Sequence, residues 1–218
     1  MIEEAVSIHR GGVESYDFHA LEVLESMIES RKGGETGVSK VEFLEGEAMW
    51  QAGKEGRWDY SLVEKAMETE PAYKPGQKVD LKHGILLEYK DGTKAAILSI
   101  TGIQWAFACR VKGDPVIKAT TFDRGPWNNR NLFKALSHAI QTFFREGDAP
   151  YPVERTLLTS GVLEAAMISR HNHKPIETPY LEFSYQPKDY KAMREMGKTW
   201  TIITEETPEP ELIAPHGL

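Results

Sequence analysis

Cysteine and long apolar runs are scarce in this sequence. Its 218 residues include one cysteine, Cys109, which allows no intrachain disulfide and no CxxC metal site and which lies in an apolar alternation typical of a core strand. No stretch reaches the roughly 20 apolar residues of a membrane helix. The N-terminus, MIEEAVSIHRGG, lacks the basic and apolar regions of a signal peptide. We therefore expect a cytoplasmic protein that makes no membrane contact.

Positive charge is also in short supply. Lys and Arg number 26 against 33 Asp and Glu, which gives a formal net charge of −7, and no long basic run is present. An acidic chain of this kind is a poor partner for nucleic acid, so we expect none. Hydrophobic residues make up 40% and charged residues 27%, proportions typical of a globular domain with a sizeable core.

The common cofactor and hydrolase motifs are missing. No G-x-G-x-x-G follows an expected strand, and Walker A, G-x-S-x-G and H-E-x-x-H sequences are absent. His171 and His173 offer two metal ligands, but no carboxylate or thiol lies near them in sequence, and histidines are ordinary at a helix C-terminus. We expect this chain alone to bind neither a metal nor a cofactor.

Apolar periodicity predicts an α+β fold. Alternation predicts strands, Asp91-Gly92 predicts a hairpin between two of them, and 3.6-residue spacing predicts helices. The expected architecture is an open, mostly antiparallel sheet with helices packed mainly on one face. The domain covers residues 1–186, and a loosely ordered, proline-containing tail covers 187–218. Expected strands include 3–9, 38–50 and 181–185, and expected helices include 16–31, a short one with a capping box from Ser61 to Glu64, 132–143 and 153–170.

The start of the first expected helix carries the main candidate chemistry. His19 and Glu22 are three residues apart, which places them on one helical face, and Asp17 lies just before them. An imidazole beside a carboxylate acts as a general acid or base. Spacing alone favours the more ordinary interpretation, a solvated polar face whose acids favour the helix N-terminus. His83 and His138 stand isolated in the sequence.

Several segments, taken in order, resemble one known module. They are GVESYDFHALE at 12–22, RKGGETGV at 31–38, LLEYKDGT at 86–93 and ERTLLTSGVLEAAMISR at 154–170, followed by KPIETP at 174–179. This order is similar to the C-terminal domain of the glucose–fructose oxidoreductase / inositol dehydrogenase (Gfo/Idh/MocA) family. The resemblance spans roughly residues 3–185.

The resemblance implies a redox function. Full-length members of the family carry an N-terminal Rossmann domain that binds NAD or NADP, and the C-terminal domain supplies oligomer contacts and substrate-facing residues. A family histidine within a D-x-G-x-H-x-x-D pattern serves in proton transfer beside the nicotinamide. His19 matches that histidine and Glu22 the trailing acid, so both are the expected catalytic residues. Ser15 stands in place of the leading acid, and Asp17 in place of the glycine, so the leading acid's role does not carry over.

The cofactor-binding half of the family is not recognisable in this chain. The expected substrate domain begins almost at Met1, and the family's E-K-P motif is absent. We expect the substrate-binding and oligomerisation portion of an NAD(P)-dependent oxidoreductase acting on a sugar, cyclitol or related polyol. It would form a homo-oligomer and be inactive without a separate Rossmann domain. The alternatives are a stand-alone binding or assembly module, with Trp105 and Phe107 on an exposed sheet, and a cofactor-free enzyme using His19 and Glu22.

Overall fold

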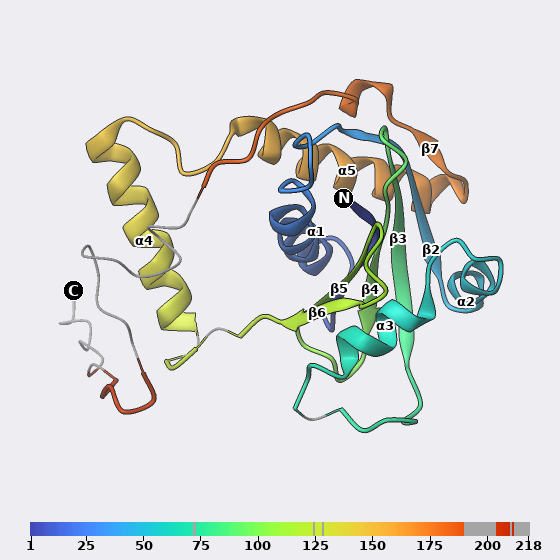
Figure 1. Cartoon of the computed structure of the whole chain (residues 1–218), viewed down its shortest axis with the longest axis horizontal. Helices are drawn as coiled ribbons and strands as arrows, with labels where there is room; N and C mark the ends of the chain where they lie inside the picture. The colour runs from blue at the N-terminus through green and yellow to red at the C-terminus, as the bar shows by residue number, and fades with distance from the viewer. Residues whose placement is uncertain (72, 124, 128, 190–203, 210, 212–218) are drawn as a thin grey trace. The chain divides into compact units, whose positions relative to one another are not determined.

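The protein is built on a seven-stranded sheet. The computed structural model describes residues 1–71, 73–123, 125–127, 129–189, 204–209 and 211, and its strands lie in the order β6-β5-β1-β4-β3-β2-β7 (Figure 1). The central pair, β1 and β4, is parallel, and the other neighbouring pairs are antiparallel. The expected α+β class with a mostly antiparallel open sheet is therefore confirmed. The strands are β1 (Ile2–His9), β2 (Val38–Glu45), β3 (Leu81–Tyr89), β4 (Lys94–Ile100), β5 (Ala106–Val111), β6 (Lys118–Thr121) and β7 (Ile176–Glu177).

The two long helices that pack on the sheet share one face, and two short helices lie on the other. Helices α1 (Ser15–Ile28) and α5 (Val153–Asn172) form one core with the sheet, and α2 (Glu47–Lys54) and α3 (Tyr60–Met67) form the second. Alternation along β1 separates the two cores, because Ala5 belongs to the α1 side and Val6 and Ile8 to the α3 side. Phe107 is buried on the α1 side, so it is not the exposed dimer contact that the assembly alternative expected.

The structure corrects three details of the predicted elements: the end of one strand, the cap of one helix and the last strand. The predicted strand 38–50 ends at Glu45, because Gly46 takes φ +54° and α2 begins directly after it. Helix α3 is capped by the Asp59 side chain, which accepts from the Ser61 backbone N–H at 2.7 Å, in place of the predicted Ser61 capping box. The predicted last strand is a 3-10 turn at Pro179–Leu181, and only Tyr185 bridges the Glu35 backbone.

The contacts group the chain into two units. One unit contains Met1–Phe122 and Tyr151–Pro187, with the sheet and the four helices named above. The other contains Asp123–Pro150 and Lys188–Leu218, with helix α4 (Asn129–Glu146). Within this second unit the Trp127 indole N–H donates to the Thr207 carbonyl at 3.0 Å. Much of the tail predicted for 187–218 lies outside the described residues.

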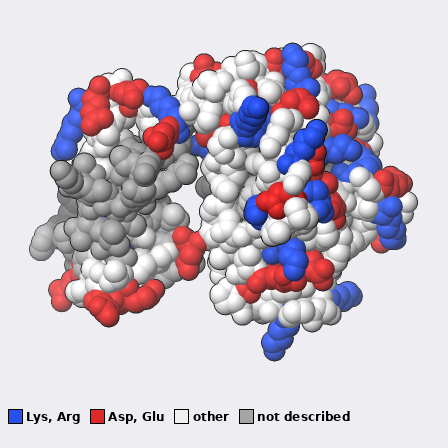
Figure 2. Space-filling view, viewed as in Figure 1, with Lys and Arg blue, Asp and Glu red and all other residues white. Residues whose placement is uncertain are grey.

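Surface charge and helix hydropathy are unremarkable. Lys and Arg are interspersed with Asp and Glu over the face of the sheet-containing unit that Figure 2 presents. Within the described ranges, none of the helices combines the length and apolarity needed to cross a membrane.

Candidate functional site

A row of polar side chains crosses the sheet beneath the start of α1. The strand register pairs His9 of β1 with Ser99 of β4, Ser99 with His83 of β3, and His83 with Glu45 of β2. Residues in register on adjacent strands point to the same face of a sheet. The Ser99 hydroxyl donates to the Gly11 carbonyl at 3.0 Å, which ties the loop before α1 to the middle of this row.

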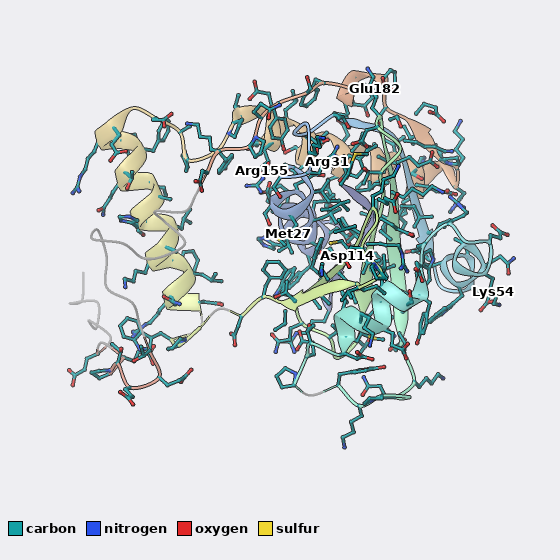
Figure 3. All side chains as sticks on the ribbon, in the orientation of Figure 1. Met27, Arg31, Lys54, Asp114, Arg155 and Glu182 are labelled. Atoms are coloured by element: carbon teal, nitrogen blue, oxygen red, sulfur yellow. The ribbon has the colours of Figure 1, made fainter. Side chains whose placement is uncertain are left out.

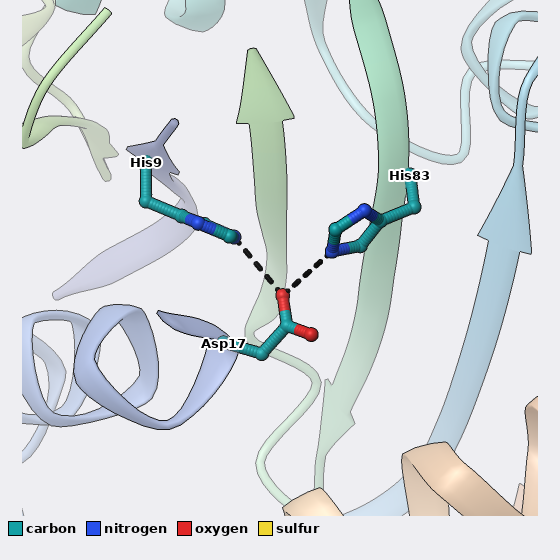
Figure 4. Close-up of side chains that lie close together, drawn as sticks. All are labelled: His9, Asp17 and His83. Atoms are coloured by element: carbon teal, nitrogen blue, oxygen red, sulfur yellow. Dashed lines mark hydrogen bonds and ion pairs between the residues drawn. The ribbon is translucent and has the colours of Figure 1, made fainter. Parts of the chain in front are cut away.

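Asp17 of α1 joins the two histidines of this row. Its Oδ1 lies 3.0 Å from His9 Nε2 and 2.8 Å from His83 Nε2, so both imidazoles approach the same carboxylate oxygen (Figure 4). Its Oδ2 accepts from the Glu14 backbone N–H at 2.7 Å. All three side chains are buried. The cluster therefore anchors the first turn of α1 to two strands.

The hydrogen-bond network assigns the protons of this cluster. The Gly11 backbone N–H donates to His9 Nδ1 at 3.2 Å, so His9 carries its proton on Nε2 and donates it to Asp17. His83 donates from Nε2 in the same way. Burial alone would raise the pKa of Asp17, but the hydrogen bonds from His83 and His9 outweigh it and hold that pKa well below its ordinary value. Asp17 is thus a carboxylate that accepts from two imidazole N–H donors.

Two imidazoles and a carboxylate are also the donor set of many zinc and iron sites. The three ligand atoms of His9, Asp17 and His83 lie within 4.8 Å of one another. A metal would need the lone pair of His9 Nε2, and the proton would then move to Nδ1, where it would face the Gly11 N–H. The residues as placed therefore fit a hydrogen-bonded anchor and do not fit a metal ion.

An aromatic wall covers this anchor. The Tyr16 and Trp105 rings are stacked, with centroids 5.9 Å apart and planes 9° from parallel, and the His9 ring lies 6.5 Å and 6.2 Å from them. Gly11 makes this stacking possible, because a Cβ at that position would lie 1.8 Å from Tyr16 Cγ. We call the Tyr16–Trp105 pair the aromatic wall.

His19 stands at the edge of the aromatic wall. It is exposed, and its ring meets Trp105 edge-on at 6.1 Å and 88° and Tyr16 at 6.1 Å and 83°. An exposed imidazole beside a flat apolar surface can exchange a proton with a ligand that stacks on that surface.

Glu22 faces a different partner. Its Oε1 accepts from the Thr159 hydroxyl of α5 at 2.9 Å, and its Oε2 lies 3.7 Å from Arg155 Nε. Among the hydrogen bonds of the described residues, none joins Glu22 to His19. His171 and His173 line a shallow groove with Glu45 and belong to neither group.

A second buried polar cluster lies further along α1. Arg31 donates to both oxygens of Glu35, at 2.7 and 3.0 Å, and to Asp91 at 2.8 Å. Nearby, the Tyr89 hydroxyl donates to Glu25, and burial together with the Glu35 carboxylate raises the pKa of Glu25 well above its ordinary value. Arg31 is labelled near α1 in Figure 3. These contacts hold the loop after α1, so the cluster is structural.

Sequence reasoning missed the part played by His9, Asp17 and His83. In the sequence, His83 stands isolated, and Asp17 stands in place of the glycine of the family pattern. The sequence signal that could have found them is the alternation of side chains between the two faces of a strand. His9 follows Ala5 and Ser7 on one face of β1. His83 precedes Ile85 and Leu87 on the same face of β3.

The chain was compared with protein-family models, curated proteins and solved structures. No protein-family model matches the chain, and no curated protein matches it significantly. Among solved structures, it is similar to an oxidoreductase from Agrobacterium radiobacter in complex with NAD+, L-tartaric acid and magnesium, at a TM-score of 0.46 and 11% identity over 81% of this chain and 57% of that one.

Two further neighbours are also oxidoreductases. A candidate myo-inositol dehydrogenase from Sinorhizobium meliloti 1021 has a TM-score of 0.45 and 12% identity over 81% of this chain and 56% of that one. The aldose-aldose oxidoreductase from Caulobacter crescentus, complexed with glycerol, has a TM-score of 0.37 and 14% identity over 81% and 55%. The chain thus spans little more than half the length of these neighbours.

Proposed function

We propose that this chain is the substrate-binding portion of an NAD(P)-dependent oxidoreductase that acts on a sugar, cyclitol or related polyol. A separate dinucleotide-binding domain would complete the active site, and the chain alone would be inactive. The observation that carries the proposal is the position of His19. It is the residue that matches the family histidine, and it is exposed beside the aromatic wall instead of buried in the core.

The aromatic wall suits a cyclic polyol. The C–H face of such a ring stacks on aromatic side chains, while its hydroxyl groups stay available for hydrogen bonds. Tyr16 is 44% exposed, so the wall offers an accessible surface next to His19. A ligand on this surface would have a hydroxyl within reach of the imidazole.

His19 would act as the proton acceptor in oxidation. The substrate hydroxyl gives its proton to the imidazole and its C–H bond breaks as a hydride departs, which leaves a carbonyl; reduction runs the same steps in reverse. The nicotinamide held by the separate domain supplies the hydride acceptor. Glu22 lies one turn along α1 from His19 and is the proposed orienting acid. Its carboxylate accepts from Thr159 and would stabilise the His19 imidazolium by placing negative charge near it.

The test begins with the DNA upstream of the Met1 codon. An in-frame βαβ-patterned segment would supply the missing domain, and that domain and this chain can then be produced together and assayed for nicotinamide reduction on aldoses, cyclitols and linear polyols. His19→Gln should lower kcat by about 10²- to 10⁴-fold, and Glu22→Gln by less. His171→Gln on α5 is the matched control. Full turnover of His19→Gln would refute the assignment.

The isolated chain gives a second test. We expect titration calorimetry with NADH to detect no low-micromolar binding, because the chain has no recognisable phosphate-binding loop. Tight NADH binding by the chain alone would contradict the proposal. A stop codon and an unrelated neighbour upstream would instead favour the stand-alone assembly module.

A further inference from the structure

The aromatic wall depends on the loop 101–105, which joins β4 to β5 and ends at Trp105. The Thr101 backbone N–H donates to the Asp80 carbonyl at 3.0 Å, and the Ile103 side chain is buried in the core on the α3 side. Trp105, two residues later, packs against the core on the α1 side. The loop thus passes from one face of the sheet to the other, and the position of the Trp105 ring follows from the groups that hold its backbone.

Glu70 holds the amide side of Trp105. It lies in the turn that ends α3, where its own backbone N–H donates to the Met67 carbonyl at 3.0 Å. Its Oε1 accepts from the Trp105 backbone N–H at 3.3 Å. The Thr121 hydroxyl of β6 lies 3.0 Å from the same oxygen and 3.0 Å from the Trp105 carbonyl. A carboxylate oxygen accepts stronger hydrogen bonds than a neutral one, so Glu70 ties this loop firmly to the end of α3.

The carbonyl side of Trp105 is held by the sheet. This carbonyl accepts from the Phe122 backbone N–H at 2.7 Å, one residue beyond the last β5–β6 register pair, Ala106 and Thr121. The regular ladder ends there, so no neighbouring strand supplies an acceptor for the Trp105 N–H. Among the described residues, that acceptor is Glu70.

The Trp105 ring is the part of the wall that this backbone carries. Its centroid lies 5.9 Å from that of Tyr16 and 6.2 Å from that of His9. It also meets His19 edge-on at 6.1 Å. His19 itself belongs to α1, whose first turn is anchored separately through Asp17. A shift of the Trp105 backbone would therefore move the wall and leave the proposed acid–base residue in place.

We propose that Glu70 is a positioning residue of the candidate site. It holds Trp105 where the ring of a cyclic polyol can stack, and it does not itself touch the substrate. This inference rests on the proposed function, because it takes the aromatic wall as the substrate-binding surface. Glu70 lies 35 residues before Trp105 and belongs to the layer that carries α3. The layer on one face of the sheet thus sets the binding surface on the other.

The isolated chain tests the positioning itself, whether or not the redox function holds. The indole N–H resonance of Trp105 can be identified by nuclear magnetic resonance from its loss in Trp105→Phe. Glu70→Ala should shift this resonance, because the Trp105 backbone N–H loses its acceptor. Glu70→Gln should restore it, because an amide oxygen can accept the same hydrogen bonds. An unshifted resonance in Glu70→Ala would overturn the proposal.

A neighbouring glutamate supplies the matched control. Glu68 lies at the same end of α3 but pairs with Lys65 at the surface, so Glu68→Ala should leave the Trp105 resonance unchanged. Thr121→Val gives a second variant should Glu70→Ala fail to fold, which circular dichroism would show. It removes one of the two donors to Glu70 and should shift the resonance in the same direction by a smaller amount.

The assembled enzyme tests the consequence for the substrate. With the separate dinucleotide-binding domain present, Glu70→Ala should raise KM for myo-inositol about 3- to 10-fold and leave kcat within about 2-fold of wild type. Glu70→Gln should return KM close to the wild-type value. A lowered kcat with unchanged KM would overturn the proposal. An inactive wild-type assembly would refute the proposed function, and with it the substrate role of Glu70, while the shift of the Trp105 resonance would still be explained by the hydrogen bond.

Discussion

Asp17 of α1 and His83 of β3 are joined by a 2.8 Å hydrogen bond across 66 residues of sequence. With His9, this bond fastens the first turn of α1 to β1 and β3 over the intervening β4. His19 lies two residues beyond Asp17 on the same helix. The orientation of the proposed acid–base residue is therefore set by a buried carboxylate that is not expected to touch substrate.

Replacing that carboxylate should destabilise the fold. Asp17→Asn leaves two buried imidazole donors facing a neutral amide, so the free energy of unfolding should fall by about 2–3 kcal/mol. Asp114→Asn, in an exposed turn, should change it by less than about 1 kcal/mol. Urea unfolding of both variants provides the measurement. Equal stability of Asp17→Asn and wild type would show that the His9–Asp17–His83 cluster is not an anchor.

Adjacent glycines offer a matched test of the aromatic wall. Gly11→Ala would place a Cβ 1.8 Å from Tyr16 Cγ, whereas a Cβ at Gly12 meets nothing within 4 Å. We expect Gly11→Ala to cost about 1–3 kcal/mol and to alter the near-ultraviolet dichroism of Tyr16 and Trp105. Gly12→Ala should leave that spectrum unchanged. A normal spectrum in Gly11→Ala would mean that the wall does not need the close approach.

Glu25 should make stability depend on pH. Burial and the neighbouring Glu35 raise the pKa of Glu25 in the folded chain, while the unfolded chain ionises it at about pH 4.3. Its contribution to stability is therefore fully present below about pH 4.3 and is lost as pH rises toward the folded pKa, by about 1.4 kcal/mol per unit at most. Glu25→Gln has no proton to lose and can still accept from Tyr89. Its stability relative to wild type should therefore increase with pH.

Thermal unfolding between about pH 5 and pH 8 measures this difference. Glu47→Gln is the control, because Glu47 is exposed on α2 beside Lys54 and should show no such trend. A constant difference between Glu25→Gln and wild type across this range would mean that Glu25 is ionised in the folded chain.

Replacing the arginine of two arginine–glutamate pairs by alanine should lower the free energy of unfolding by very different amounts. Arg31 is 4% exposed and pairs with Glu35 and Asp91. Arg31→Ala leaves the buried Glu35 and the partly buried Asp91 without their cation, so it should cost about 3–5 kcal/mol. Arg170 pairs with Glu45 at the surface, and Arg170→Ala should cost about 1 kcal/mol or less. Chemical denaturation compares the two, and similar losses would contradict the assignment of the Arg31 cluster as a structural lock.

The sequence was most informative where a long apolar pattern repeats. The helix at 153–170 and the hairpin at Asp91-Gly92 were predicted close to their observed bounds, because periodicity and turn chemistry act locally. The helix at 132–143 was also predicted, but α4 extends three residues further at each end. The strand predicted at 181–185 failed for a local reason. Pro179 begins a 3-10 turn, and within that segment the β-bridge is made by Tyr185, which pairs with Glu35.

The anchor beneath α1 was harder to predict because it depends on strand order. Alternation places His9 and His83 on one face of their own strands, but only the β1–β4–β3 order brings them to the same carboxylate. His19 was singled out by resemblance, and its exposure beside Trp105 became visible only once β5 lay next to β1.

Helix α5 closes the core late in the order of synthesis. It packs over β2, where the Ser169 hydroxyl accepts from the Phe43 backbone N–H at 3.0 Å, yet more than a hundred residues separate the two in the chain. Val41 and Phe43 of β2 belong to the core that α5 completes. During synthesis on the ribosome, these side chains therefore lack the cover of α5 until that helix has left the exit tunnel. The growing chain thus passes through a stage that chaperones would recognise, and slow codons after β6 would prolong it.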